Sequence, residues 1–89
     1  MEPLIIDTRE PFEYAASHVE GSINISPSEF MQGGVPEKLC DVPKDQQIIL
    51  YCRSGQRSNT CSMILRQYGF TNLVNGVNEG RVRALLKQL

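Results

Sequence analysis

The sequence has almost no net charge, no long apolar run and an odd number of cysteines, and each of these features argues against a class of protein. The net charge is −1, so we expect neither a nucleic acid nor an anionic membrane as a partner. No apolar run approaches the roughly 18 residues that span a bilayer. The segment MEPLIID lacks the basic and apolar parts of a signal peptide. Three cysteines suit a disulfide scaffold poorly, so we expect free thiols and a reducing, cytoplasmic setting.

The length and the overall composition are those of a small globular domain. Of the 89 residues, 40% are hydrophobic and 21% are charged. We therefore expect one domain over residues 1–89. A chain this short buries a modest fraction of its surface, so its core has to come from short, efficiently packed elements.

Short apolar runs bounded by polar or turn-forming residues predict β-strands along the whole chain. The clearest run ends at Tyr51, where four successive apolar residues include two β-branched ones. The expected strands are Leu4–Asp7, Ser22–Ile25, Gln47–Tyr51 and Asn72–Val74.

Apolar residues at the three- and four-residue spacing of one helical face predict three amphipathic helices. The three faces are Phe12, Ala15, Ala16 and Val19; Cys61, Ile64, Leu65 and Tyr68; and Val82, Leu85, Leu86 and Leu89. Pro11 fits the first turn of the first helix. The second helix is expected from about Gln56 to Tyr68, with Gly69 as its C-terminal stop.

Two shorter helical segments are expected between the second and third strands. Ser26-Pro27-Ser28-Glu29 matches a capping box, which predicts a short helix through about Met31. A turn of helix is expected near Glu37–Cys40. Short strands that alternate with helices indicate an α/β fold with a small, mainly parallel sheet covered by helices on both faces.

Cys52 directly follows the clearest strand, so it is expected at the sheet edge where ligands of such folds bind. The predicted helix after it offers unpaired N–H groups and partial positive charge, and Arg53 and Arg57 add full charges. Gly55 lets the backbone curl so that successive N–H groups face inward. We therefore predict a lowered pKa for Cys52 and a role as nucleophile. A buried structural cysteine is the alternative, but the wholly polar RSGQRS that follows disfavours it.

The same loop predicts the kind of ligand that would approach Cys52. Inward N–H groups and guanidinium groups favour a small anion with several acceptor oxygens. Sulfur oxyanions, phosphate and arsenate all meet this requirement, so the loop alone does not select the reaction.

The stretch CRSGQRS, Cys52–Ser58, resembles the active-site loop of the rhodanese sulfurtransferases. Three further stretches carry the resemblance in the same order along nearly the whole chain. They are Leu4–Arg9, similar to the first strand with its Asp-x-Arg; Glu13 with Ser17–Ile25, similar to the second element, usually Gly-His-Ile-x-Gly-Ala-x-Asn-Ile; and Ile48–Cys52, similar to the strand before the cysteine.

The resemblance implies sulfur transfer in two half-reactions, with no metal or organic cofactor. The Cys52 thiolate would take the outer sulfur of a donor such as thiosulfate, and an acceptor such as cyanide, a small thiol or a protein thiol would collect it from the persulfide. Arg53 and Arg57 would hold the sulfonate end of thiosulfate. The substrate-binding residues implied in this way are Arg53, Ser54, Gly55, Gln56, Arg57 and Ser58.

Two other classes of function remain open. Cysteine phosphatases of related fold and some arsenate reductases have five residues between the cysteine and the arginine, whereas four separate Cys52 from Arg57. This shorter loop, which also lacks a general-acid aspartate, favours sulfur transfer. The other class is a persulfide carrier or interaction module that passes sulfur to a protein partner with little turnover of small molecules.

The chain departs from the family pattern in two regions. Ser17 replaces the usual glycine before His18, and Glu20-Gly21-Ser22 replaces the commoner Pro-Gly-Ala. The segment Asn75–Gly80 lacks the usual glycine pair, and the chain contains no tryptophan. Because the second region borders the active site in the family, its divergence affects acceptor identity more than catalysis.

The remaining polar residues are assigned supporting or structural roles. Asp7 would pair with Arg57 or with Arg9 and so orient the loop, the alternative being that these charges are solvated. Ser58 is expected to cap the helix or to donate to the loop. His18 is expected to make a structural hydrogen bond, since attack of a thiolate on sulfur needs no base.

The other two cysteines are not expected to take part in catalysis. Cys61 is expected in the core, with a resolving thiol as the alternative, and Cys40 is expected to be incidental. A metal site built from His18, Cys40, Cys52 and Cys61 lacks any paired ligand spacing, so no metal is expected.

Overall fold

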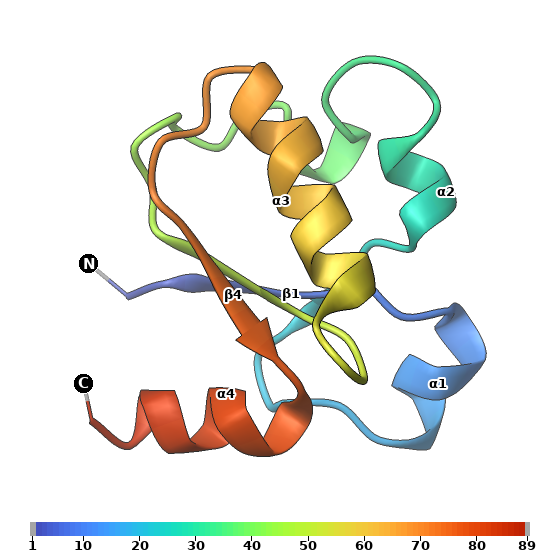
Figure 1. Cartoon of the computed structure of the whole chain (residues 1–89), viewed down its shortest axis with the longest axis vertical. Helices are drawn as coiled ribbons and strands as arrows, with labels where there is room; N and C mark the ends of the chain where they lie inside the picture. The colour runs from blue at the N-terminus through green and yellow to red at the C-terminus, as the bar shows by residue number, and fades with distance from the viewer. Residues whose placement is uncertain (1, 89) are drawn as a thin grey trace.

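The computed structural model describes residues 2–88, which form an α/β fold as the sequence predicts (Figure 1). The strands are β1 (Leu4–Asp7), β2 (Ile23–Asn24), β3 (Ile48–Tyr51) and β4 (Leu73–Val77). The helices are α1 (Pro11–Ala16), α2 (Pro27–Phe30), the single 3₁₀ turn η1 (Glu37–Leu39), α3 (Gln56–Gln67) and α4 (Glu79–Leu86). Within the part of the chain described, no helix is both long and apolar enough to cross a membrane.

The four strands form one parallel sheet in the order β2-β1-β3-β4. Asp7 at the end of β1 pairs in register with Tyr51 at the end of β3. The pairing of β3 with β4 shifts by one residue between Leu50 and Tyr51, so that Tyr51 lies opposite Val77. Cys52 therefore leaves the sheet at its carboxyl edge, next to a local irregularity in β4.

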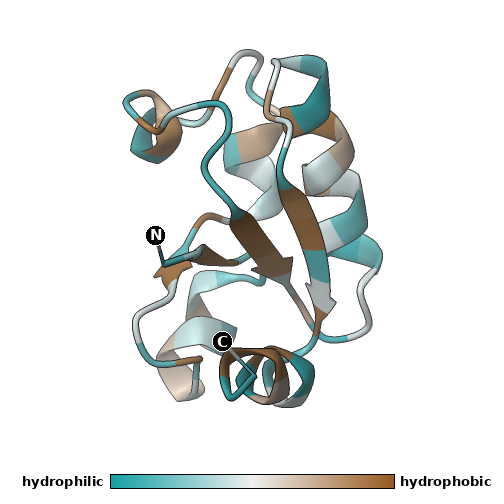
Figure 2. Cartoon of the chain, turned by 90° about the vertical axis from the view of Figure 1, so that its left-hand side faces the viewer, coloured by the Kyte–Doolittle hydropathy of each residue, from teal (hydrophilic) through white to brown (hydrophobic). Residues whose placement is uncertain are grey.

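Helices cover both faces of the sheet, which confirms the predicted layers. Side chains alternate along β3, so Ile48 and Leu50 face one layer while Ile49 and Tyr51 face the other. The first layer is completed by α2, η1 and α3, and the second contains Val82 of α4. Figure 1 shows α3 and α4 on opposite sides of the strands, and Figure 2 shows apolar strand segments enclosed between them.

Local signals in the sequence locate most helix ends correctly. Ser26 and Glu29 form the predicted capping box at the start of α2. Helix α3 begins after Gly55 and ends before Gly69, and both glycines have positive φ angles, of 93° and 95°. Strand β2 is shorter and β4 longer than expected.

The predicted apolar face of the first helix is wrong. Helix α1 ends at Ala16 and has no buried residue; Phe12 is 76% exposed, while Val19 is buried beyond the helix end. The spacing of apolar residues defines a helical face but does not say whether anything packs against it. The apolar face predicted for the second helix is largely confirmed. Cys61 and Leu65 are buried, although Tyr68 is 39% exposed. In the third, Val82 is buried and Leu89 lies outside the described residues.

Candidate active site

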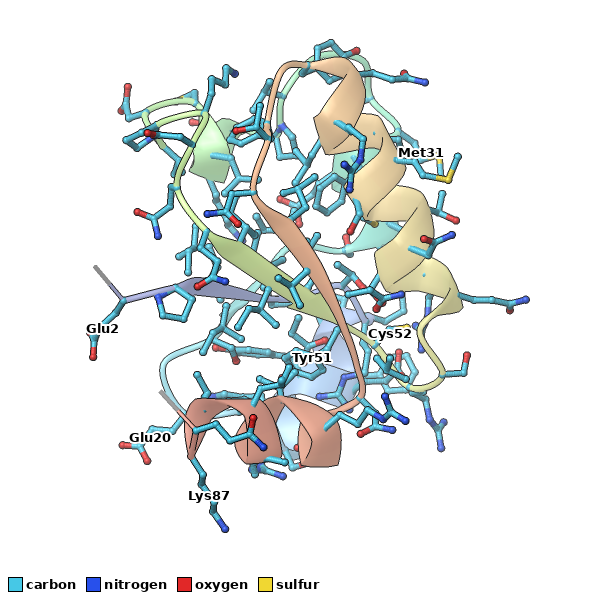
Figure 3. All side chains as sticks on the ribbon, turned by 60° about the vertical axis from the view of Figure 1, so that its left-hand side comes forward. Glu2, Glu20, Met31, Tyr51, Cys52 and Lys87 are labelled. Atoms are coloured by element: carbon cyan, nitrogen blue, oxygen red, sulfur yellow. The ribbon has the colours of Figure 1, made fainter. Side chains whose placement is uncertain are left out.

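Cys52 lies at the carboxyl edge of the sheet, directly after β3, as Figure 3 shows beside Tyr51. Its backbone N–H donates to the carbonyl of Val77 over 3.1 Å, which attaches the residue to β4. The residue is only 2% exposed. A reacting molecule must therefore reach the sulfur through the cleft that Cys52 lines.

Two groups of the following loop and helix start contact the Cys52 sulfur. The Gly55 N–H donates to Sγ over 3.1 Å, and the Ser58 hydroxyl lies 3.6 Å from Sγ. Gly55 has a φ of 93°, which only glycine adopts readily, and it turns the chain into α3. The backbone thus curls around the sulfur as the glycine predicted.

These contacts set the acidity of the thiol. Burial raises the pKa of Cys52, but the Ser58 backbone N–H and hydroxyl, with the N–H groups of Ser54 and Gly55, lower it to about 7. The direction agrees with the prediction from sequence. The main stabilising groups are the inward N–H groups that the sequence predicted, and the Ser58 hydroxyl adds to them.

The arginines of the loop are placed differently from each other. Arg57 forms a two-pronged ion pair with Glu13 of α1, with N–O distances of 2.8 and 3.2 Å. Arg53 is exposed and forms no ion pair with any residue in the range 2–88. No local sequence pattern indicates the partner of Arg57, since Glu13 is 44 residues away in the chain.

Asp7 pairs with Arg9 and not with Arg57. Both oxygens of the fully buried Asp7 accept from the Arg9 guanidinium, at 2.7 to 3.0 Å, and the Tyr51 hydroxyl also donates to Asp7. Arg9 reaches further to Glu79 at the start of α4 and to the Ser17 carbonyl. Arg9 therefore connects the end of β1 with the start of α4, whereas an orienting effect of the pair on the loop stays a prediction.

Asn75 connects the loop to β4, a role that was not predicted from the sequence. Its Oδ1 accepts from the Ser58 hydroxyl over 2.7 Å and from the Val77 N–H over 3.0 Å, while its Nδ2 donates to the Gly55 carbonyl over 3.1 Å. Val77 has a φ of 71°, unusual for a β-branched residue, and the hydrogen bond that its N–H donates to Asn75 helps to hold it there. A polar asparagine within a short apolar strand was the sequence feature that could have indicated this role.

A cleft of about 450 Å³ opens above Cys52. It is lined by Arg9, Phe12, Glu13, Ala16, Ser17, Cys52, Arg53, Asn78, Glu79 and Gly80. Glu79 is paired with Arg9 and with Arg83, and Glu13 with Arg57. Arg53 is therefore the cationic group of the cleft that remains available to a ligand.

The other sulfur and imidazole groups lie apart from this arrangement. Cys61 is fully buried in the core, as expected, and burial raises the pKa of its thiol to about 12. Cys40 is exposed, and all three thiols are free. His18 donates through Nδ1 to the Tyr14 carbonyl over 2.8 Å, and its ring stacks on the Tyr14 ring. Residues 2–88 contain no cluster of three side chains suited to a metal.

The sequence of the whole region that builds this site matches a known family. A sequence model described as "Rhodanese-like domain" matches residues 1–82. The chain belongs to the rhodanese family. The match includes both walls of the cleft, the loop after Cys52 and the Asp7–Arg9 pair.

Relatives in this family include known sulfurtransferases. The chain is 36% identical over 72 residues to the thiosulfate sulfurtransferase PspE of Escherichia coli, covering 79% of this chain and 64% of that protein. It is 31% identical over 77 residues to the thiosulfate:glutathione sulfurtransferase of Saccharomyces cerevisiae, covering 78% of this chain and 55% of the relative. The chain spans 20% to 64% of the length of the curated relatives it matches.

A solved structure supports the same rhodanese fold. A rhodanese from E. coli, determined with anions, superposes with a TM-score of 0.76 at 28% identity, covering 90% of this chain and 91% of the other. Together with the sulfurtransferase relatives, this likeness supports sulfur transfer as the general class of reaction.

Proposed function

We propose that this rhodanese domain, residues 1–89, transfers a sulfane sulfur from thiosulfate or a similar donor to cyanide or a thiol acceptor through a persulfide on Cys52. The observation that carries the proposal is the ring of donors around the sulfur. The Gly55 N–H at 3.1 Å and the Ser58 hydroxyl at 3.6 Å hold a thiol with a pKa of about 7 at the base of a cleft. Such a thiol is substantially ionised at neutral pH and is therefore a nucleophile.

In the first half-reaction the Cys52 thiolate attacks the outer sulfur of thiosulfate. A new sulfur–sulfur bond forms on Cys52 while the bond inside thiosulfate breaks, and its electron pair leaves with sulfite. In the second half-reaction the carbon of cyanide attacks the outer sulfur of the persulfide. Thiocyanate leaves and the Cys52 thiolate returns, so no net oxidation, proton donor or cofactor is required.

The loop residues have distinct roles in this scheme. N–H groups of residues 53–58 would stabilise the persulfide anion as they stabilise the thiolate. Arg53 would attract the sulfonate end of the donor, and Ser54, Gln56 and Arg57 would shape the rest of the binding loop. Asp7 and Arg9 support the cleft from below. The three free thiols agree with a reducing, cytoplasmic setting.

A persulfide carrier for a protein partner is the second candidate. Phe12 lines the cleft and is 76% exposed, so an apolar side chain of a partner has a contact surface at the rim. Phosphate and arsenate chemistry is less well supported. Arg57, the loop residue that would bind a tetrahedral oxyanion, already gives both prongs of its guanidinium to Glu13.

The test is the intact mass of the protein after incubation with thiosulfate and then with cyanide. We expect the wild type to gain the mass of one sulfur atom, about 32 Da, and to lose it to cyanide. The variant Cys52→Ala is the control and should gain nothing. A reduced wild type that gains no sulfur from thiosulfate contradicts this donor, and loading by a cysteine desulfurase instead would favour the carrier.

A further inference from the structure

The Glu13 carboxylate is fixed by two donors, the guanidinium of Arg57 and the backbone N–H of Glu10. The Arg57 guanidinium donates to both Glu13 oxygens, at 2.8 and 3.2 Å, and the Glu10 backbone N–H donates to one of them over 3.0 Å. The Glu13 side chain is 11% exposed. The hydrogen bond from Arg57 is the main cause that lowers the pKa of Glu13 to about 2, so its carboxylate is ionised throughout the neutral range.

This pair changes the charge that a substrate meets. Glu13 lines the cleft together with Cys52, whereas Arg57 is absent from the residues that line it. Arg57 instead lines a neighbouring hollow with Met31 and Gln56. A carboxylate therefore faces the entering molecule where a cationic binding group was expected from the sequence.

We propose that Glu13 determines which sulfur donor is accepted, by occupying the guanidinium of Arg57 and by opposing dianionic donors in the cleft. Donors with less charge beside the transferable sulfur, such as organic thiosulfonates, are favoured over thiosulfate. This inference rests on the proposed function and specifies the donor class of the same site. Its physical basis is that a dianion has to lie near the Glu13 carboxylate or displace it from Arg57.

The experiment compares thiosulfate, a dianion, with benzenethiosulfonate, a monoanion, with cyanide as the acceptor in both cases. We expect Glu13→Gln to raise kcat/KM for thiosulfate about tenfold, chiefly through KM, because Arg57 is released to bind the second charge. The value for benzenethiosulfonate should change less than threefold, so the ratio of the two donors shifts. The shift should diminish at high salt.

Two matched variants separate the charge from its position. Glu20→Gln removes the same charge at an exposed site away from the cleft, as Figure 3 shows, and should leave the donor ratio unchanged. Glu13→Asp keeps the charge and should retain the wild-type preference. Glutamine at residue 13 keeps an oxygen that can accept from the Glu10 N–H, so α1 retains that bond.

A second measurement needs no sulfur transfer. Sulfate, an unreactive dianion, should protect Cys52 of Glu13→Gln from iodoacetamide at about one tenth of the concentration that the wild type requires. An unchanged donor ratio, or a lower kcat/KM for thiosulfate in Glu13→Gln, overturns the inference while the proposed function stands. If neither donor loads the wild type, the proposed function fails, and equal sulfate protection would then overturn the inference independently.

A third measurement uses the wild type alone, in case Glu13→Gln does not fold. The wild type should have a higher kcat/KM for benzenethiosulfonate than for thiosulfate. A preference for thiosulfate overturns the inference.

Discussion

Cys52 receives its decisive hydrogen bonds from the backbone of its own loop. The N–H groups of Ser54, Gly55 and Ser58 are directed at the sulfur by the turn at Gly55. They offset the burial that would otherwise keep the thiol protonated. At the residue scale, reactivity is thus a property of chain geometry, whereas Cys61, equally buried but without these donors, has a pKa of about 12.

This contrast predicts how the three thiols react with iodoacetamide as pH rises. Alkylation of Cys52 should increase about tenfold per pH unit below 7 and level off above it, because only the thiolate reacts. Cys61 should stay unmodified in the native protein up to pH 9. Peptide mass spectrometry of timed samples measures all three sites. The exposed Cys40 is the internal control for reagent and time of exposure. A Cys52 midpoint at or above the ordinary thiol value of about 8.5 would contradict the assignment.

At the scale of elements, α4 packs closely on the sheet because Gly76 has no side chain. A Cβ added at Gly76 would lie 2.5 Å from Val82 Cγ2 and 2.9 Å from Ile49 Cγ2. Both neighbours are buried, one on α4 and the other on β3, so neither can move without disturbing the core. The glycine therefore sets the distance between helix and sheet.

Gly76→Ala and Gly80→Ala should change stability in opposite directions. The first should lower the free energy of unfolding by about 1–3 kcal/mol, because the new methyl group overpacks the core. The second should raise it by about 0.5–1 kcal/mol, because Gly80 lies in α4 and a Cβ there meets its nearest neighbour at 3.5 Å. Urea unfolding measures both. Equal effects of the two substitutions would show that the Gly76 contact does not limit packing.

The elements that could be predicted from sequence are those with local signals. Pro27 with the capping box around it, and Gly69 after α3, act through neighbouring residues and were placed correctly. Phe12 was misplaced because its exposure depends on the absence of a partner for α1, which no local pattern records. The strand β4 was expected to end before Val77 for the same reason. It extends to Val77 because that residue pairs with Tyr51 of the neighbouring strand, which no local pattern records.

At the scale of the whole molecule, the Asp7–Arg9 pair joins segments that are far apart in the chain. Arg9 contacts Asp7 of β1, the carbonyl of Ser17 after α1, and Glu79 of α4, and its guanidinium lies 5.6 Å from the centre of the Tyr51 ring. Among these groups Asp7 is completely buried. The pair therefore links β1, the segment after α1 and the start of α4 beside the cleft.

Arg9→Leu should destabilise the protein by about 3–5 kcal/mol, because the Asp7 carboxylate remains buried without its cation. The double variant Asp7→Leu/Arg9→Leu removes both charges and should regain a large part of the loss. Urea or thermal unfolding, followed by far-ultraviolet circular dichroism, measures the three proteins. A double variant that is less stable than Arg9→Leu alone would show that the pair contributes net stability beyond charge compensation.

For the candidate site, the sequence was informative about the nucleophile and less so about its surroundings. Cys52 and the turn at Gly55 were predictable because strand, loop and helix are contiguous in the chain. The partner of Arg57 was not, since Asp7, Glu13 and other carboxylates were equally available until the topology brought α1 beside α3. Asn75 was missed for the same reason, as its three contacts come from an element that pairs across the sheet.

The backbone donors around Cys52 also bear on how such a site can evolve. Every residue except proline carries a main-chain N–H, so exchange of the side chains at Arg53 or Ser54 leaves their own N–H groups in place. The size and charge of the side chains at the mouth of the cleft can therefore change by single mutations. Each intermediate protein keeps the backbone donors that make Cys52 reactive. Selection has to preserve the path of the chain through Gly55, while the choice of donor and acceptor is free to diverge between lineages.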